Sequence, residues 1–168
     1  MRFIALGWTI EGAVTLEGEF FLFEVAKSTR TGAARILSGT VGACNGGSVV
    51  FLRASFPWEV AYESFNGTLP EIRAINFTIV DASIQGTVSG ISCLARSSTT
   101  NPLRASLSLV LEAGQLKPNS LTMEPVESIP LTGTFCTGSS GRVEGTSSIY
   151  EPNTEQISRM LIILRTLI

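Results

Sequence analysis

Apolar residues recur at every second position in most segments of this 168-residue chain. The clearest case is residues 106–112, Ser-Leu-Ser-Leu-Val-Leu-Glu, which lie between Asn101-Pro102 and Gly114. A period of two places apolar side chains on one face of a β-strand. The pattern therefore constrains the chain to a fold built from half-buried strands.

The strand candidates follow one another at short, regular spacing and are separated by Gly, Pro and Asn, as in antiparallel sandwiches and barrels. They cover residues 9–17, 19–26, 34–43, 48–55, 58–65, 72–84, 87–95, 104–112, 121–135 with a break, and 142–150. The length suits one domain over residues 1–168. We expect an all-β, antiparallel two-layer sandwich, with a closed or partly closed antiparallel barrel as the alternative.

Two segments carry turn signals. Asn66-Gly67 lies between two strand candidates, and both residue types tolerate the positive φ that a type I′ hairpin turn requires. Pro118-Asn119 predicts a second turn, because Pro fixes φ and Asn accepts turn geometry. The second turn would pair the strand of Leu107 with the strand of Leu121.

The last segment, residues 154–168, allows two interpretations. Asn153 and Gln156 would form a helical capping box, followed by apolar residues on one helical face. Residues 151–154 also suit a turn, which would return the chain as a strand against residues 142–150. We favour the strand.

The composition excludes many enzyme classes. The chain has no histidine, one aspartate (Asp81) and two lysines, Lys27 and Lys117, so histidine-dependent triads are ruled out. A Ser/Lys pair would need a lysine from an expected turn, and no phosphate-binding glycine loop or nucleophile elbow is present. We predict no catalytic residue and no cofactor. A net charge of −2 also makes nucleic acid an unexpected partner.

Paired glutamates are the remaining route to enzymatic chemistry, through glycoside hydrolysis. Glu59 and Glu63 share a strand face but lie roughly 13 Å apart along it, beyond the separations this chemistry uses. Glu17 and Glu19 come nearer, at about 7 Å between backbones. Solvated strand faces account for both pairs.

Trp58, Val60 and Tyr62 point to one side of their strand. Their simplest role is in the hydrophobic core. Aromatic residues with a polar tip also stack on sugar rings, so Trp58 and Tyr62 are the candidate ligand contacts.

The two ends of the chain do not predict a membrane span. No segment approaches the roughly 18 consecutive apolar residues that a membrane-spanning helix needs. Residues 1–10 begin with one Arg and a short apolar run that Glu11 ends, which makes a poor signal peptide.

Residues 56–72, residues 91–97 and Phe135-Cys136 carry a resemblance to a known pattern: a Pro-Trp strand, a Gly-Thr-Leu-Pro turn and later cysteines, in that order. The chain resembles an uncharacterised family of small secreted β-rich proteins from high-GC Gram-positive bacteria, over roughly Cys44 to the C-terminus. This family has no established activity. The resemblance implies export and an all-β fold.

Three cysteines cannot all pair within one chain, and their spacing matches no Cys-Xaa-Xaa-Cys zinc arrangement, so no metal site is predicted. The resemblance implies a disulfide between Cys93 and Cys136, which closes a long loop worth about 3 to 5 kcal/mol. Cys44 would then be an unpaired thiol, with a bond to a partner chain or to a segment missing from the start as alternatives. In a reducing compartment all three would be free thiols.

The expected function is that of a non-catalytic extracellular or envelope-associated β-domain, which binds a partner or assembles through edge strands or Cys44. One alternative is a barrel that holds a small apolar ligand. Another is a glycan-acting enzyme using glutamates. The expected location is secreted or in the cell envelope, with the cytoplasm as the alternative.

Overall fold

The computed structural model describes residues 1–20, 28–68, 71–112, 115–124 and 129–149. These residues contain twelve strands and one short 3₁₀ helix. The elements are β1 (Arg2–Ala5), β2 (Trp8–Phe20), β3 (Gly32–Asn45), β4 (Ser48–Phe51), η1 (Arg53–Ser55), β5 (Trp58–Thr68), β6 (Glu71–Val80), β7 (Ser83–Val88), β8 (Ile91–Arg96), β9 (Leu103–Glu112), β10 (Gln115–Glu124), β11 (Ile129–Thr132) and β12 (Ser140–Ser148). Every strand pair is antiparallel, which confirms the all-β antiparallel class.

Eight strands form a ring. They are hydrogen-bonded in the order β1-β2-β3-β5-β6-β9-β10-β12, and β12 pairs with β1 to close it. Closure is partial, because β3 pairs with β5 only over the segment from Gly32 to Ile36. The ring corresponds to the partly closed barrel that the sequence allowed as an alternative.

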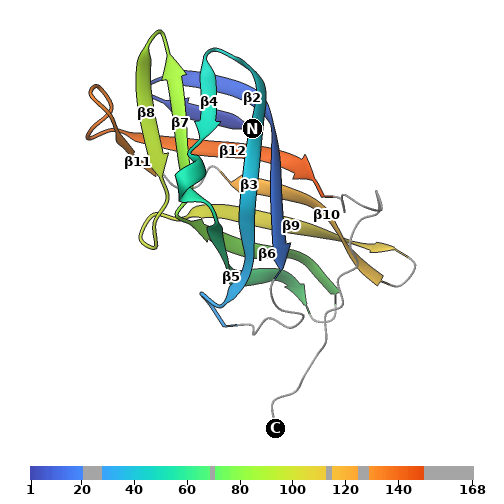
Figure 1. Ribbon diagram of the computed structural model, residues 1–168. Coiled ribbons are helices and arrows are strands. Elements are labelled where there is room, and N and C mark those ends of the chain that lie inside the picture. The colour runs from blue at the N-terminus through green and yellow to red at the C-terminus, as the bar shows by residue number, and fades with distance from the viewer. Residues whose placement is uncertain (21–27, 69–70, 113–114, 125–128, 150–168) are drawn as a thin grey trace.

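The other four strands form a side sheet that branches from the ring at β12. β11 pairs with β12 through Ile129 and Pro130, and with β8 through Leu131 and Thr132. The order then continues from β8 to β7 and β4. Figure 1 shows β4, β7 and β8 side by side above β12, with β5, β6, β9 and β10 below it.

One hydrophobic core joins the side sheet to the ring. The Phe51 ring of β4 meets the Trp58 ring of β5 edge to face, with 5.2 Å between centroids. Phe3 of β1 packs on Gly86 of β7, where a Cβ atom would overlap the phenyl ring. This packing gives part of the molecule the two-layered character expected of a sandwich.

β9 follows the alternation expected from the sequence. Leu103, Ala105, Leu107 and Leu109 are buried, and the residues between them are half-buried and face outward. The predicted pairing of Leu107 with Leu121 is confirmed. The outer face of this strand therefore carries the polar residues.

The prediction of a turn at Asn66-Gly67 is wrong. Both residues lie inside β5, which continues to Thr68, and Gly67 is paired with Ile72 of β6. Gly67 does take a positive φ of 107°, but at a register shift within the ladder. A β-bulge uses the conformational freedom of glycine as a turn does.

The prediction of a turn at Pro118-Asn119 is wrong for a related reason. Both residues lie inside β10, where the register with β9 shifts between Pro118 and Ser120. Proline lacks an N–H donor and is tolerated in a strand at such an irregularity.

Two strand boundaries also differ from prediction. The segment 72–84 is divided between β6 and β7 at Asp81, which has a φ of 64°. The segment 87–95 is divided by a turn at Ser89 and Gly90, both with positive φ. In each case the alternation of apolar and polar residues continues through a chain reversal. The sequence pattern therefore does not show where the turn lies.

The first strand was not predicted. β1 lies between β2 and β12 and pairs with both. The alternation of apolar residues is too short there to predict a strand, and the run of residues 1–10 makes only a poor signal peptide. Residues 154–168, for which strand and helix compete, lie outside the described residues, and so does most of the strand expected over 19–26.

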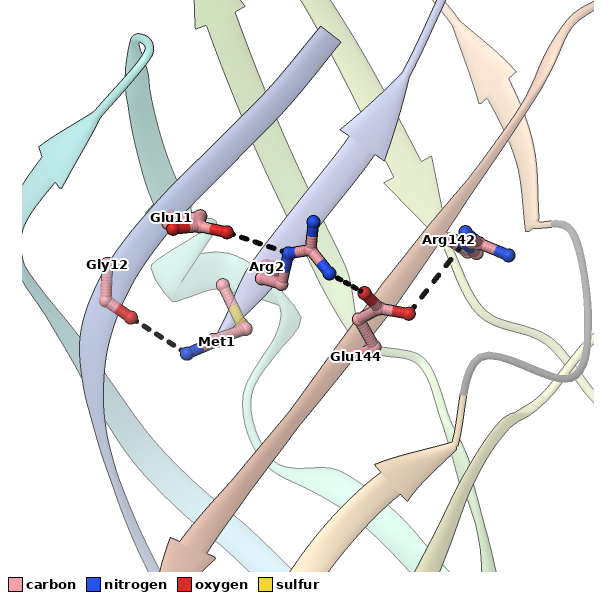
Figure 2. Close-up of polar contacts among 6 residues, drawn as sticks. All are labelled: Met1, Arg2, Glu11, Gly12, Arg142 and Glu144. Carbon is pink, nitrogen blue, oxygen red and sulfur yellow. Dashed lines mark hydrogen bonds and ion pairs between the residues drawn. The ribbon is translucent and has the colours of Figure 1, made fainter. Parts of the chain in front are cut away.

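A row of charged side chains crosses the closure of the ring on its outer face (Figure 2). Arg2 of β1 contacts Glu11 of β2 and Glu144 of β12, each at 2.8 Å, and Arg142 approaches Glu144 at 3.8 Å. Since ion pairs with a solvent-exposed partner contribute roughly 0 to 1 kcal/mol each, the row adds little to the stability of the fold.

Candidate functional site

A pocket of about 440 Å³ opens on the outer face of the ring. Its lining comes from the segment before β3, from β5, β6 and β9, and from the end of β10. The lining residues are Thr29, Glu63, Ser64, Asn76, Arg104, Ala105 and Glu124. Six of these seven side chains are polar, so the pocket differs in chemistry from the core behind it.

The strand pattern explains why these side chains face outward. Asn76 is paired with Ser64 on β5 and with Ser106 on β9, and Arg104 is paired with Glu124 on β10. Paired residues in an antiparallel sheet point to the same face. The register therefore gathers polar side chains from four strands at one place.

Glu63 owes its position to an irregularity in β5. The register between β5 and β6 shifts between Tyr62 and Ser64, which leaves Glu63 outside the regular pairing. The Thr29 hydroxyl donates to the Glu63 carbonyl oxygen at 3.4 Å. Bulges of this kind re-aim a side chain and occur often beside functional sites.

Charge is concentrated on three of the lining residues. Arg104 Nη2 lies 3.4 Å from Glu63 Oε1, and the two side chains are 35% and 27% exposed. Glu124 contributes a second carboxylate. Two carboxylates and one guanidinium give these side chains a net charge of −1, which disfavours anionic ligands.

Asn76 is the centre of a hydrogen-bonded group in the pocket wall. Its Nδ2 donates to Ser64 Oγ at 2.9 Å, and its Oδ1 accepts from Ser106 Oγ at 2.9 Å. An amide bonded at both ends has a fixed orientation. Its Nδ2 also donates to Asn66 Oδ1 at 3.4 Å, so what Asn76 presents in a defined direction is its remaining acceptor site.

The pocket lining bears on two kinds of chemistry, nucleophilic attack by a serine and hydrogen bonding to a ligand. A serine nucleophile needs a neighbouring base, and Ser64 is bonded to the Asn76 amide, which does not take up a proton. Carboxylate, guanidinium, amide and hydroxyl groups together supply donors and acceptors for a ligand rich in hydroxyl groups.

The sequence-predicted ligand contacts lie elsewhere. Trp58 is fully buried and Tyr62 is 8% exposed, and both belong to the inner face of β5. Neither lines the pocket. Their burial on the inner face of β5 matches a role in the hydrophobic core.

Burial raises the pKa of the Tyr62 phenol above its ordinary value of 10.0. The folded state then holds the proton at a pH where the unfolded state releases it, so stability falls as pH rises above about 10. We expect Y62F to reduce this alkaline loss, measured by urea denaturation at several pH values between about 8 and 11. Equal alkaline losses in the two proteins would contradict it.

Three of the four glutamates that the sequence grouped in pairs have partners on other strands. Glu59 pairs with Arg35 on β3 at 3.0 Å, while Glu63 contacts Arg104. Glu17 accepts a hydrogen bond from Ser38 Oγ at 2.8 Å. Instead, the pocket combines Glu63 with Glu124.

Sequence reasoning missed Glu124, Arg104 and Asn76. Their only signal is that each alternates with apolar neighbours, a pattern that any solvated strand face shows. The correct pairing of β6, β9 and β10 would have brought them together.

The cysteines form the expected disulfide. Cys93 of β8 is bonded to Cys136, which follows β11, and both are fully buried. Cys44 is a half-buried free thiol. The described residues include no helix with the length and hydropathy of a membrane span.

Assembly through edge strands stays a prediction. β4 is the last strand of the side sheet and has β7 as its hydrogen-bonded neighbour in the described part of the chain.

The described residues include no group of three His, Cys, Asp or Glu side chains that could hold a metal ion.

Comparisons of this chain with protein-family models, with curated proteins and with solved structures found no match.

Proposed function

We propose that this chain is a non-catalytic, extracellular or envelope-associated β-domain that binds a hydroxyl-rich ligand in the pocket formed by β5, β6, β9 and β10. One observation carries the proposal. The pocket of about 440 Å³ is lined by a carboxylate–guanidinium pair, a second carboxylate, an oriented amide and hydroxyl groups.

The chemistry of a sugar hydroxyl matches this lining. A hydroxyl both donates and accepts hydrogen bonds, so it pairs with a carboxylate or an amide oxygen through its hydrogen and with a guanidinium through its oxygen. Hydrogen bonds to charged groups contribute about 1.5 to 3 kcal/mol each. Glu63, Arg104 and Glu124 are the residues expected to contribute most.

The disulfide supports an extracellular or envelope location. Disulfides persist in oxidising compartments and are rare where thiols are kept reduced. The buried Cys93–Cys136 bond therefore favours export, in agreement with the resemblance to a secreted family.

The two alternatives from the sequence have less support. An apolar ligand needs an apolar cavity, and Ala105 is the single apolar residue in the pocket lining. A glutamate-based hydrolase would use Glu63 and Glu124, which share the pocket. Release of sugar from a glycan would distinguish hydrolysis from binding.

The test is an NMR titration of the ¹⁵N-labelled protein with N-acetylglucosamine, glucose and glucuronate. We expect the two uncharged sugars to shift amide signals around the pocket. E63Q should weaken binding by about tenfold, the loss of one charge-assisted hydrogen bond.

E59Q is the matched control, because Glu59 also lies on β5 and is ion-paired, to Arg35, but does not line the pocket. It should bind as the wild type does. Absence of binding to all three sugars would overturn the proposal. Release of sugar from a labelled glycan, abolished by E63Q or E124Q, would replace it with the hydrolase.

A further inference from the structure

The neutral hydrogen-bond donors of the pocket lining are mostly used within the protein. The Asn76 amide has two N–H groups, which donate to Ser64 Oγ at 2.9 Å and to Asn66 Oδ1 at 3.4 Å. The Thr29 hydroxyl donates to the Glu63 carbonyl oxygen at 3.4 Å. The Ser64 hydroxyl accepts the Asn76 bond and keeps its own proton for a ligand.

The hydrogen-bond acceptors of the lining are in excess. Glu63 and Glu124 each bring two carboxylate oxygens, and every such oxygen accepts more than one hydrogen bond. Arg104 Nη2 contacts one of these oxygens, Glu63 Oε1, at 3.4 Å. Asn76 Oδ1 keeps an acceptor site beside the bond that it accepts from Ser106. The pocket therefore matches a ligand group that mainly donates hydrogen bonds.

Glu124 is a carboxylate without a cationic partner in the described part of the chain. Arg104 lies opposite Glu124 in the ladder of β9 and β10, but its guanidinium is ion-paired with Glu63. None of the ion pairs among the described residues includes Glu124, which is half-buried. Because a carboxylate that has lost part of its hydration is stabilised by an opposite charge, a cationic ligand group would be favoured at Glu124.

A primary ammonium beside hydroxyl groups combines the properties that the pocket selects. An ammonium has three donors, no acceptor and one positive charge, which fits both the acceptor excess and the net charge of the lining. Hydroxyl groups donate and accept, so they fit the Glu63–Arg104 pair and Ser64. The volume of about 440 Å³ is near the lower end for small-molecule pockets, which suits one sugar unit.

Building on the proposed function, we infer that the preferred ligand of the pocket is an amino sugar with a free, protonated amine. Its ammonium group binds Glu124, and its hydroxyl groups bind Glu63, Arg104 and Ser64. N-acetylation turns the ammonium into a neutral amide with a single donor, so an N-acetylated sugar loses the interaction of opposite charges with Glu124. Neutral sugars then bind through their hydroxyl groups alone, and more weakly.

The test compares glucosamine with glucose and N-acetylglucosamine by NMR titration of the ¹⁵N-labelled protein at about pH 6, where a primary amine is protonated. We expect glucosamine to bind about tenfold more tightly than either neutral sugar. E124Q keeps the size of the side chain and removes its charge. It should weaken glucosamine binding about tenfold and glucose binding by less than about threefold.

E112Q is the matched control, because Glu112 of β9 is ion-paired with Lys117 of β10 and does not line the pocket. It should leave the affinities for all three sugars unchanged, and unchanged melting temperatures would show that both variants fold. n-Butylamine tests the amine without hydroxyl groups and should bind about tenfold more weakly than glucosamine.

The outcomes separate this inference from the proposed function. Equal affinity of the wild type for glucosamine and glucose would overturn the inference and leave the proposed function standing. Equal losses for both sugars in E124Q would also overturn it, because Glu124 would then not recognise the ammonium. Butylamine that binds as tightly as glucosamine would replace the amino sugar with a simple amine. Binding of none of the sugars would overturn both proposals.

Discussion

Replacing Cys93 and Cys136 together by alanine (C93A/C136A) is expected to lower the free energy of unfolding by about 4 kcal/mol. The bond joins residues 43 positions apart, so its loss releases a long loop in the unfolded chain. Both side chains are fully buried, and the small change of volume adds little to this effect. Typical domains have only about 5 to 15 kcal/mol of stability, so the loss is large.

The measurement is equilibrium urea denaturation, followed by circular dichroism. Wild-type protein that is unfolded and refolded with a reductant should match C93A/C136A. C44S is the control, because Cys44 is free: it should resemble the wild type when oxidised and lose the same stability on reduction. Equal stability of oxidised and reduced wild type would contradict the prediction.

The Cys93–Cys136 bond can also be used to test the proposed location of the protein. It ties β8 of the side sheet to the loop that follows β11, where the side sheet branches from the ring. Peptide mapping of natively produced protein, with free thiols alkylated before reduction, detects this disulfide directly. A Cys93–Cys136 peptide with alkylated Cys44 supports export, and three alkylated thiols favour a reducing compartment.

The fold class follows from alternation, and β9 shows why. Its buried and outward residues repeat with period two over most of the strand, and one slip would expose every apolar side chain. The pairing of Leu107 with Leu121 follows from the same constraint. Local hydrophobic pattern thus determines strands and near-neighbour pairs.

Turns and ring closure are less accessible from sequence. Gly67 adopts a positive φ in a β-bulge. Bulges and turns both favour glycine at such a position, so the residue type does not distinguish them. Closure pairs Arg2 with Glu144, positions far apart in the chain, and no local pattern specifies that contact. The alternation of apolar residues is therefore compatible with both a sandwich and a barrel.

Most residues of the candidate site could not be predicted from the sequence for the same reason. Glu63 could be named from the sequence, but only as the partner of Glu59 on one strand. Its neighbours in the pocket, Arg104 and Glu124, come from β9 and β10. A site made of single residues from adjacent strands becomes visible only when the register is known.

W58A is expected to lower the free energy of unfolding by about 4 kcal/mol. Trp58 is fully buried; its ring stacks on Phe56 with centroids 4.6 Å apart and meets Phe51 at 5.2 Å. Its Nε1 donates to Ser55 Oγ at 2.9 Å. Removing the indole leaves a cavity at the contact between the side sheet and the ring.

The matched control is S55A, which removes the hydroxyl that accepts the indole N–H and donates to the Leu52 carbonyl oxygen at 2.7 Å, but leaves the aromatic packing. It should cost about 1 kcal/mol. Urea denaturation followed by circular dichroism measures both variants, since fluorescence would lose one of the two tryptophans. A loss for W58A no larger than that for S55A would mean that the indole is not part of the core, and Trp58 would return as a candidate ligand contact. The expected difference of about 3 kcal/mol instead assigns Trp58 to joining the two sheets, and leaves ligand recognition to the polar outer face.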